Sequence, residues 1–184
     1  HAFFQEVRMP SFHILTGPPG SGKSTVLRHL SGTCHLAEEP ARRVLALQRR
    51  IDGQGTGDRN PALFVQLMLE QAIGDHDAAL STPGPVVFDR GLPDLLAYAA
   101  YWQLDTGPID RAIAARGRAR NVFWFPAWQA IYAPDDERTL DFAGAAAFGA
   151  LTRRAYEGLG YTLIDMPLAD AETRAVFILD AIGV

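Results

Sequence analysis

The sequence predicts a three-layer α/β fold, with helices on both faces of a mostly parallel, five-stranded sheet. Short apolar runs typical of buried strands alternate along the chain with segments of helical periodicity. The 184 residues, 48% of them hydrophobic and 21% charged, have the composition of an ordinary globular protein. A chain of this length is long enough to bury one sizeable core.

The first half of the chain contains two predicted strands and three predicted helices. The strands are expected at residues 12–16 and 34–38, and the helices at 23–30, 40–51 and 61–73. Pro61 favours the start of the third helix, because its missing N–H costs nothing in a first turn. The polar segment 52–60 has no apolar residue to anchor it, so a mobile loop is expected there.

The second half continues the alternation. Strands are predicted at residues 86–89, 121–125 and 161–165, and helices at 92–104, 109–115, 142–159 and 171–182. Gly160 is expected to end the long helix before it, and segment 133–141 is a polar loop. Because no repeat or linker interrupts residues 10–184, a single domain is expected. Residues 1–9 are an upstream extension or a remnant of cloning.

Charge and cysteine content exclude several classes of protein. A net charge of −4 and a pI near 5.7 argue against a dedicated nucleic-acid-binding protein. No apolar run is long enough to span a bilayer, and the lone Cys34 cannot form an internal disulfide, so a cytoplasmic protein is expected. The basic residues comprise sixteen arginines and one lysine, Lys23.

Residues 17–24, GPPGSGKS, match the phosphate-loop pattern GxxxxGK[ST], between the first predicted strand and helix. Glycines let the backbone N–H groups point inward where a side chain would clash with phosphate. Lys23 would bring a compact charge to the phosphates and Ser24 a hydroxyl ligand for Mg²⁺. Arginine is a poor substitute, because its planar fork is larger. The predicted nucleotide-binding residues are Gly17, Pro18, Pro19, Gly20, Ser21, Gly22, Lys23, Ser24 and Thr25.

Two predicted strands end in an aspartate. Asp89 is followed at once by Arg90, at the carboxyl end of a buried strand, where ligands bind in open α/β sheets. Asp89 can serve a Mg²⁺ ion or orient an acceptor hydroxyl, and Arg90 can clamp an anionic group. Alternatively, the pair forms a turn that satisfies neighbouring backbone groups and charges. Asp165, which precedes a proline by two residues, is expected to be a turn residue.

The phosphate loop is accompanied by three further segments: EPAR at 39–42, FDRGLPDLLAYA at 88–99 and RRAYEGLGYTLID at 153–165. Together they resemble the AAA-type ATPase domain shared with NadR-like, nicotinamide-riboside-kinase-like proteins, among the P-loop nucleoside and nucleotide kinases. The resemblance covers residues 10–182 and implies a P-loop NTPase core that binds ATP, or GTP, with Mg²⁺. It places Lys23, Asp89, Arg90 and Arg138 at the catalytic centre, Arg138 in a lid. It places Ser24 and Asp89 at the metal, and Glu39, Arg42, Arg90 and Asp94 at a small-molecule acceptor.

Simpler interpretations stay open for several of these residues. Glu39 and Arg42 are spaced as a solvated pair at a helix start, and Arg138 has acidic neighbours with which to form an exposed ion pair. Three aromatic residues at helical spacing are core or pocket wall: Tyr98, Tyr101 and Trp102.

The leading prediction for function is a Mg²⁺-dependent kinase acting on a small, hydroxyl-bearing, nucleoside-like acceptor. A regulatory NTPase that signals through a partner is the second hypothesis. A module that binds anionic lipid or nucleic acid through the arginines of 42–50 and 116–120 is the third.

Overall fold

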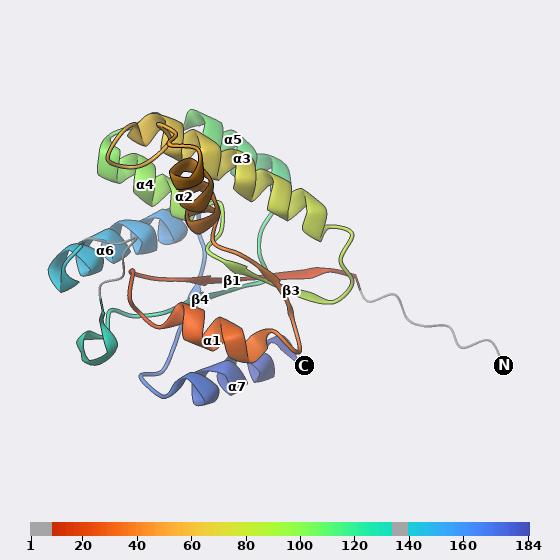
Figure 1. Cartoon of the computed structure of the whole chain (residues 1–184). Helices are drawn as coiled ribbons and strands as arrows, with labels where there is room; N and C mark the ends of the chain where they lie inside the picture. The colour runs from red at the N-terminus through yellow and green to blue at the C-terminus, as the bar shows by residue number, and fades with distance from the viewer. Residues whose placement is uncertain (1–8, 134–139) are drawn as a thin grey trace.

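The computed structural model, which describes residues 9–133 and 140–184, contains a five-stranded sheet with helices on both faces (Figure 1). The strands are β1 (Ser11–Thr16), β2 (His35–Ala37), β3 (Pro85–Asp89), β4 (Asn121–Trp124) and β5 (Leu163–Asp165). Their order is β2-β3-β1-β4-β5, and every pairing is parallel. All five carboxyl ends therefore lie at one edge, where Leu15 of β1 stands in register with Asp89 of β3.

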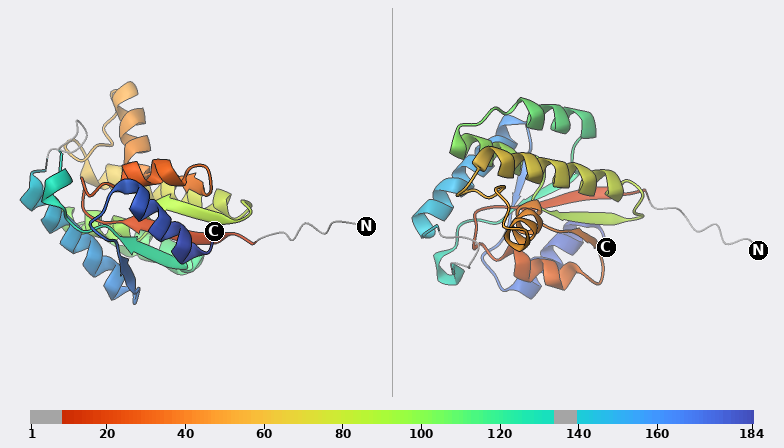
Figure 2. Two further views of the ribbon diagram at one scale, coloured as in Figure 1. Left: turned by 90° about the horizontal axis from the view of Figure 1, so that it is seen from below. Right: turned by 45° about the horizontal axis from the view of Figure 1, so that its top comes forward.

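Alternate residues of the central strands face opposite layers of helices. Helices α1 (Lys23–Leu30) and α7 (Ala171–Ile182) pack together on one face, over Leu15, Val87 and Phe123 (Figures 1 and 2). The opposite face carries Ile14, Val86, Phe88 and Val122, and is covered in part by α6 (Phe142–Gly158) through the buried Tyr156. Because the central strands are buried on both faces, their sequences are continuous apolar runs.

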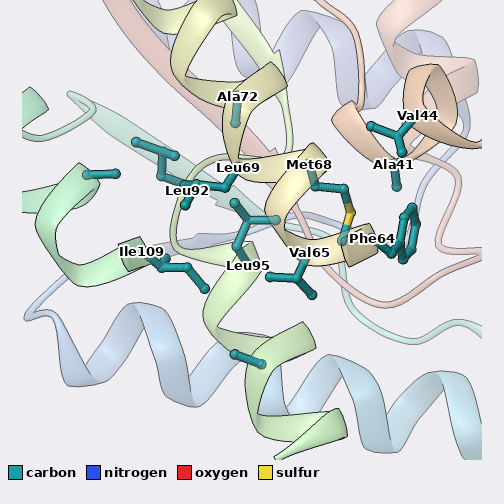
Figure 3. Close-up of a cluster of buried hydrophobic side chains, with 12 residues drawn as sticks. Ala41, Val44, Phe64, Val65, Met68, Leu69, Ala72, Leu92, Leu95 and Ile109 are labelled. Carbon is teal, nitrogen blue, oxygen red and sulfur yellow. The ribbon is translucent and has the colours of Figure 1, made fainter. Parts of the chain in front are cut away.

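The helices α2 (Pro40–Arg50), α3 (Pro61–Ala79), α4 (Asp94–Trp102) and α5 (Gly107–Arg116) share a second apolar core (Figure 3). Met68 of α3 lies near its middle with Leu95 of α4, and Phe64 of α3 lies at its edge beside Val44 of α2. This core holds α2 and α4 in place beyond the carboxyl edge of the sheet. No helix within the described residues is long and apolar enough to cross a membrane.

The predicted elements are confirmed, with differences at their ends. Helix α3 continues six residues past the predicted end at 73, because Gly74 does not break it. Asp75 accepts hydrogen bonds from Arg43 (2.9 Å) and Gln71 (2.8 Å), and the His76 ring packs against Phe88. These contacts offset the roughly 1 kcal/mol that glycine costs inside a helix. A short 3₁₀ helix at Gln129–Ile131 was not predicted.

Segment 52–60 differs from the expected loop because it is anchored. Oε1 of the buried Gln48 accepts a hydrogen bond from the Gly55 N–H (2.9 Å), and the Gln48 carbonyl accepts one from the Gly53 N–H (2.8 Å). Arg59 closes the segment with an ion pair to Asp52 (2.7 Å). A polar side chain from the preceding helix therefore anchors a segment that was expected to be mobile because it lacks apolar residues.

Candidate active site

The phosphate loop between β1 and α1 has a backbone that requires glycine. Gly17 and Gly20 have φ angles of 143° and 72°, in the region that side chains disfavour. A Cβ on Gly17 would lie 2.2 Å from the Phe125 carbonyl oxygen, and one on Gly20 would lie 2.6 Å from the Tyr132 ring. The loop is thus packed between β4 and the segment after it, which fixes its curvature.

Lys23 opens α1 and folds its side chain back over the loop. The side chain is buried, with 4% of the residue exposed. Its Nζ donates to the carbonyl oxygens of Gly17 (3.4 Å) and Pro18 (3.2 Å) and to Ser21 Oγ (3.3 Å). The next two residues, Ser24 and Thr25, are exposed in the first turn of α1. The loop therefore presents an ammonium group together with two accessible hydroxyls.

Arg90 lies just after β3 and is the centre of a buried ionic cluster. Its Nε donates to Glu39 Oε1 (3.0 Å) and its Nη1 to Asp94 Oδ1 (2.9 Å), with all three side chains almost fully buried. Burial alone lowers the pKa of this guanidinium, but the charges of Glu39 and Asp94, with Tyr98 and Asp89, raise it well above its ordinary value. Arg90 has a φ of 67°, a strained value that these two ion pairs offset.

Glu39 reaches this cluster because β2 ends two residues before it and Pro40 starts α2 directly after it. The second carboxylate oxygen, Oε2, accepts from Arg42 Nε (3.2 Å), one turn into the helix. Only 1% of Glu39 is exposed. The expected pair of Glu39 and Arg42 is therefore present, but the interpretation of it as a solvated pair is wrong.

Both oxygens of the Asp94 carboxylate accept hydrogen bonds from other residues of the protein. Oδ1 accepts from Thr16 Oγ1 (2.6 Å) as well as from Arg90, and Oδ2 accepts from the Gly91 N–H (2.9 Å) and the Tyr156 hydroxyl (2.5 Å). Burial and the Asp94 carboxylate raise the pKa of Tyr156 well above its ordinary value, so the phenol stays a donor. Asp94 thereby ties β1, α4 and α6 together behind Arg90.

A cavity of about 680 Å³ lies beside the phosphate loop, between α2, segment 52–60, α4 and α6. Pro19 of the loop and Glu39 are part of its wall. Five aromatic side chains form an apolar side: Phe64, Tyr98, Tyr101, Trp102 and Phe148. Three arginines and two further carboxylates line the rest: Arg42, Arg49, Arg59, Asp52 and Asp58. The volume is that of pockets that bind small molecules.

The structure separates the residues that were predicted to face an acceptor. Glu39 and Arg42 line the cavity, whereas Asp89, Arg90 and Asp94 do not. The aromatic residues of α4 are pocket wall, one of the two expected alternatives. Asp165 pairs with Arg153 (2.8 Å), consistent with a structural role. Arg138 lies outside the described residues.

Several of the arginines that were proposed to bind lipid or nucleic acid form ion pairs or hydrogen bonds within the protein. Arg43 pairs with Asp75 (2.9 Å), and Arg116 forms a two-fold contact with Asp77 (3.0 Å for both bonds). Arg118 donates to the Leu159 carbonyl (2.6 Å) and lies over the Tyr161 ring. This arrangement gives no support to the third hypothesis.

Arg174, in the first turn of α7, contacts the phosphate loop and was not predicted. Its Nη1 donates to the Ser21 carbonyl oxygen (3.1 Å). The sequence contained one indication that Arg174 is buried, because it shares a helix face with Ala175 and Ile178. An arginine on an apolar helix face needs a partner inside the protein.

The predicted Mg²⁺ ligands fit the metal by their chemistry. Ser24 supplies a hydroxyl and Asp89 a carboxylate, and hard oxygen donors are what Mg²⁺ prefers. Within the described residues, no cluster of three or more His, Cys, Asp or Glu side chains could hold a metal ion by itself. This agrees with the usual Mg²⁺ site beside a nucleotide, in which one or two protein ligands act with phosphate oxygens and water.

The sheet order, the glycine-rich loop between β1 and α1, and the adjoining cavity define a P-loop fold of the nucleoside-kinase type. The chain belongs to the AAA domain family, whose model matches residues 12–174. No match is found among curated proteins.

Several solved structures share this fold. NadR in complex with NR superposes with a TM-score of 0.75 at 16% identity, over 96% of this chain and 52% of NadR, so the chain spans about half the length of that protein. NadR in complex with NAD and AMP-PNP gives a TM-score of 0.70 at 14% identity, over 96% of this chain and 50% of that one.

Two kinases match over nearly their whole length. Thymidylate kinase from Ehrlichia chaffeensis has a TM-score of 0.64 at 16% identity, over 96% of this chain and 99% of the enzyme. Deoxyadenosine kinase from M. mycoides, with the products dCMP and dCDP, has a TM-score of 0.65 at 13% identity, over 92% and 97%. At these identities the similarity shows a common fold.

Proposed function

We propose that this protein is an ATP-dependent phosphotransferase that phosphorylates a hydroxyl group of a small, nucleoside-like acceptor. The observation that carries the proposal is the position of the cavity, whose wall includes both Pro19 of the phosphate loop and the buried residue Glu39. An acceptor in this cavity would lie next to a phosphate chain held by the loop. The aromatic wall suits a planar ring, which gains from stacking.

Glu39 is the residue we assign to the acceptor hydroxyl. Glu39 is part of the cavity wall, and its carboxylate is held from two sides by Arg42 (3.2 Å) and Arg90 (3.0 Å), which fix its orientation. The acceptor hydroxyl transfers its proton to Glu39 as its oxygen bonds to the γ-phosphorus of ATP, and ADP leaves with the electrons of the broken P–O bond. Orientation of this kind contributes more to phosphoryl transfer than covalent chemistry does.

Lys23 and the loop N–H groups would bind the phosphates, and Ser24 and Asp89 would hold Mg²⁺. The metal, when bound, supplies positive charge to the phosphate oxygens. We therefore assign Asp89 to the metal, as predicted from the sequence. We assign Glu39 instead of Asp89 to orient the acceptor hydroxyl, because Asp89 does not line the cavity. Arg90 acts on Glu39 and is a positioning residue.

The similar structures support this choice of substrates. NadR is recorded in complex with NR and with the ATP analogue AMP-PNP, and two further relatives of the fold are nucleoside or nucleotide kinases. The names of these two kinases point to ligands that carry a nucleobase, and a planar ring of that kind is compatible with the aromatic wall of the cavity.

The test is a screen of nucleosides and nucleoside monophosphates with ATP and Mg²⁺, in which phosphorylated product and ADP are both measured. With an acceptor in hand, Glu39→Gln should lower kcat by about 100-fold or more, because the proton acceptor is lost. ATP affinity should change less than about threefold in the same variant. Glu38→Gln is the matched control, since Glu38 is adjacent and its side chain is 66% exposed.

Two outcomes would contradict the proposal. If every acceptor leaves ADP formation unchanged and only slow phosphate release is seen, the protein is better described as a regulatory NTPase. If Glu39→Gln and Glu38→Gln have the same kcat, the role assigned to Glu39 is wrong.

A further inference from the structure

Arg174 is a buried cation that the proposed reaction does not use. Only 4% of it is exposed, although it lies in the first turn of α7. Its guanidinium carbon is 5.5 Å from the ring centres of both Phe125 and Trp128. Its Nη1 donates to the Ser21 carbonyl oxygen in the phosphate loop (3.1 Å), 153 residues earlier in the chain. The side chain is thus enclosed by β4, the segment after it and the loop.

Arg174 forms no ion pair with any carboxylate among residues 9–133 and 140–184, and its buried Nε has no hydrogen-bond partner there. Asp170 is one turn earlier, but its carboxylate caps α7 through the Thr173 N–H (2.7 Å). Burial lowers the pKa of Arg174, and Asp170 offsets this only in part. A buried, uncompensated charge is costly, so its retention calls for a counter-charge.

Ser21 links this cation to the second one in the loop. Its carbonyl oxygen accepts from Arg174, while its hydroxyl accepts from Lys23 Nζ (3.3 Å). Arg174 also closes over the next residue, since a Cβ on Gly22 would lie 2.8 Å from Nη2. Two buried cations therefore flank one residue of the loop, Lys23 over the loop itself and Arg174 from the side of β4 and α7.

We propose that Arg174 is a second cation of the phosphate site, which strengthens the binding of a polyphosphate chain from behind the loop. The inference rests on the proposed function, because it assumes that the loop binds a nucleoside di- or triphosphate. Arg174 is a positioning residue: it holds the Ser21 carbonyl outward, and its charge acts on the phosphates across the loop. Without an anion its charge costs stability, and a bound polyphosphate offsets that cost.

This arrangement has a consequence that an ordinary structural arginine would not have. Removing the charge should weaken polyphosphate binding without lowering the stability of the protein alone, because replacing a buried charge by an apolar side chain is often neutral or stabilising. The loss should also grow with the charge of the ligand, and it should be greater for ATP than for AMP.

The test compares Arg174→Met, Arg174→Lys and the control Arg154→Met in the full chain. Arg154 is exposed on α6, and among residues 9–133 and 140–184 its one recorded acceptor is the Ala150 carbonyl of its own helix. Titration calorimetry gives the Kd for ATP, ADP, AMP and inorganic tripolyphosphate, and thermal unfolding gives the Tm without ligand. Arg174→Met should raise the Kd for ATP and tripolyphosphate about tenfold, and that for AMP about twofold, at a Tm equal to or above that of the wild type. Arg174→Lys should stay within about threefold of wild-type affinity, because the charge is kept.

Three results would overturn the inference. Arg174→Met could bind ATP as the wild type does. It could lower the Tm or fail to fold, which would indicate a structural side chain. Or Arg174→Lys could lose as much affinity as Arg174→Met, so that charge is not the cause. If the wild type binds polyphosphate, shows the predicted loss in Arg174→Met and yet phosphorylates no acceptor, the proposed kinase activity fails while this inference stands. If the wild type binds neither ATP nor tripolyphosphate, both fail.

Discussion

Replacing Asp94 by asparagine tests whether the buried ionic cluster holds the active site together. The substitution keeps the size of the side chain and removes its charge. Asp94 accepts four hydrogen bonds, from Thr16, Arg90, Gly91 and Tyr156, and the asparagine amide has one acceptor oxygen in place of two. Its NH₂ group must therefore meet either the Arg90 and Thr16 donors or those of Gly91 and Tyr156.

The expected cost follows from which groups lose their partners. If the NH₂ group faces Gly91, the backbone N–H is left unsatisfied, which costs about 1–3 kcal/mol, whereas the Tyr156 hydroxyl can turn to accept. Arg90 keeps Glu39 but loses the charge of Asp94, and a hydrogen bond between charged groups is worth about 1.5–3 kcal/mol. The sum, about 2.5–6 kcal/mol, brackets the roughly 3–5 kcal/mol that breaking a buried ion pair typically costs.

Thermal unfolding followed by circular dichroism measures this cost. A domain of this size loses about 2–4 °C of Tm per kcal/mol, so Asp94→Asn should unfold roughly 10 °C below the wild type. The control is Asp165→Asn, whose carboxylate is 65% exposed and pairs with Arg153 (2.8 Å). An exposed pair is worth about 0–1 kcal/mol, so the control should lose about 3 °C at most. Equal Tm values for the two variants would refute the cluster as a source of stability.

Two further substitutions test contacts away from the cluster. Burial, with the nearby Arg120, lowers the pKa of His13 from 6.5 to about 4. Between about pH 4 and pH 6.5, the His13 side chain therefore binds a proton in the unfolded chain but not in the folded one. Stability should fall by about 3 kcal/mol as the pH drops from 6.5 to 4, and His13→Gln should show a smaller fall in Tm over that range; an unchanged pH profile would contradict this. Gln48→Ala removes the bond to Gly55 and should speed tryptic cleavage at Arg59 about fivefold, whereas Gln66→Ala, on the exposed face of α3, should not. Equal cleavage rates would show that Gln48 is not the anchor.

The phosphate loop could be predicted from the sequence because its structure is encoded locally. Eight consecutive residues contain the glycines that the backbone needs, and the first strand and helix that flank them are also local. The sequence also placed Asp89 correctly at the end of a buried strand. The strand order was not predicted, because the pairing of β1 with β3 and β4 joins segments far apart in the chain.

The sequence could not tell which of three carboxylates lines the cavity. Glu39, Asp89 and Asp94 are all carboxylates near strand ends, and nothing local says which one lines a cavity. The packing of α2 against α3 decides it, since this places Glu39 in the cavity wall and leaves Asp94 behind Arg90. Arg174 was missed for the same reason, because its partner Ser21 lies at the other end of the chain.

The geometry around Lys23 explains why the only lysine among the basic residues lies at this position. Its Nζ has three oxygen acceptors at 3.2–3.4 Å, from Gly17, Pro18 and Ser21, within a loop closed by glycines. An ammonium group has three donors on one compact atom, and these match acceptors that surround a point. A guanidinium spreads five donors over a plane, as Arg90 does when it reaches Glu39 with one nitrogen and Asp94 with another. The guanidinium of Arg90 can therefore bridge two separate carboxylates, whereas the ammonium of Lys23 fits one charge inside a curved backbone.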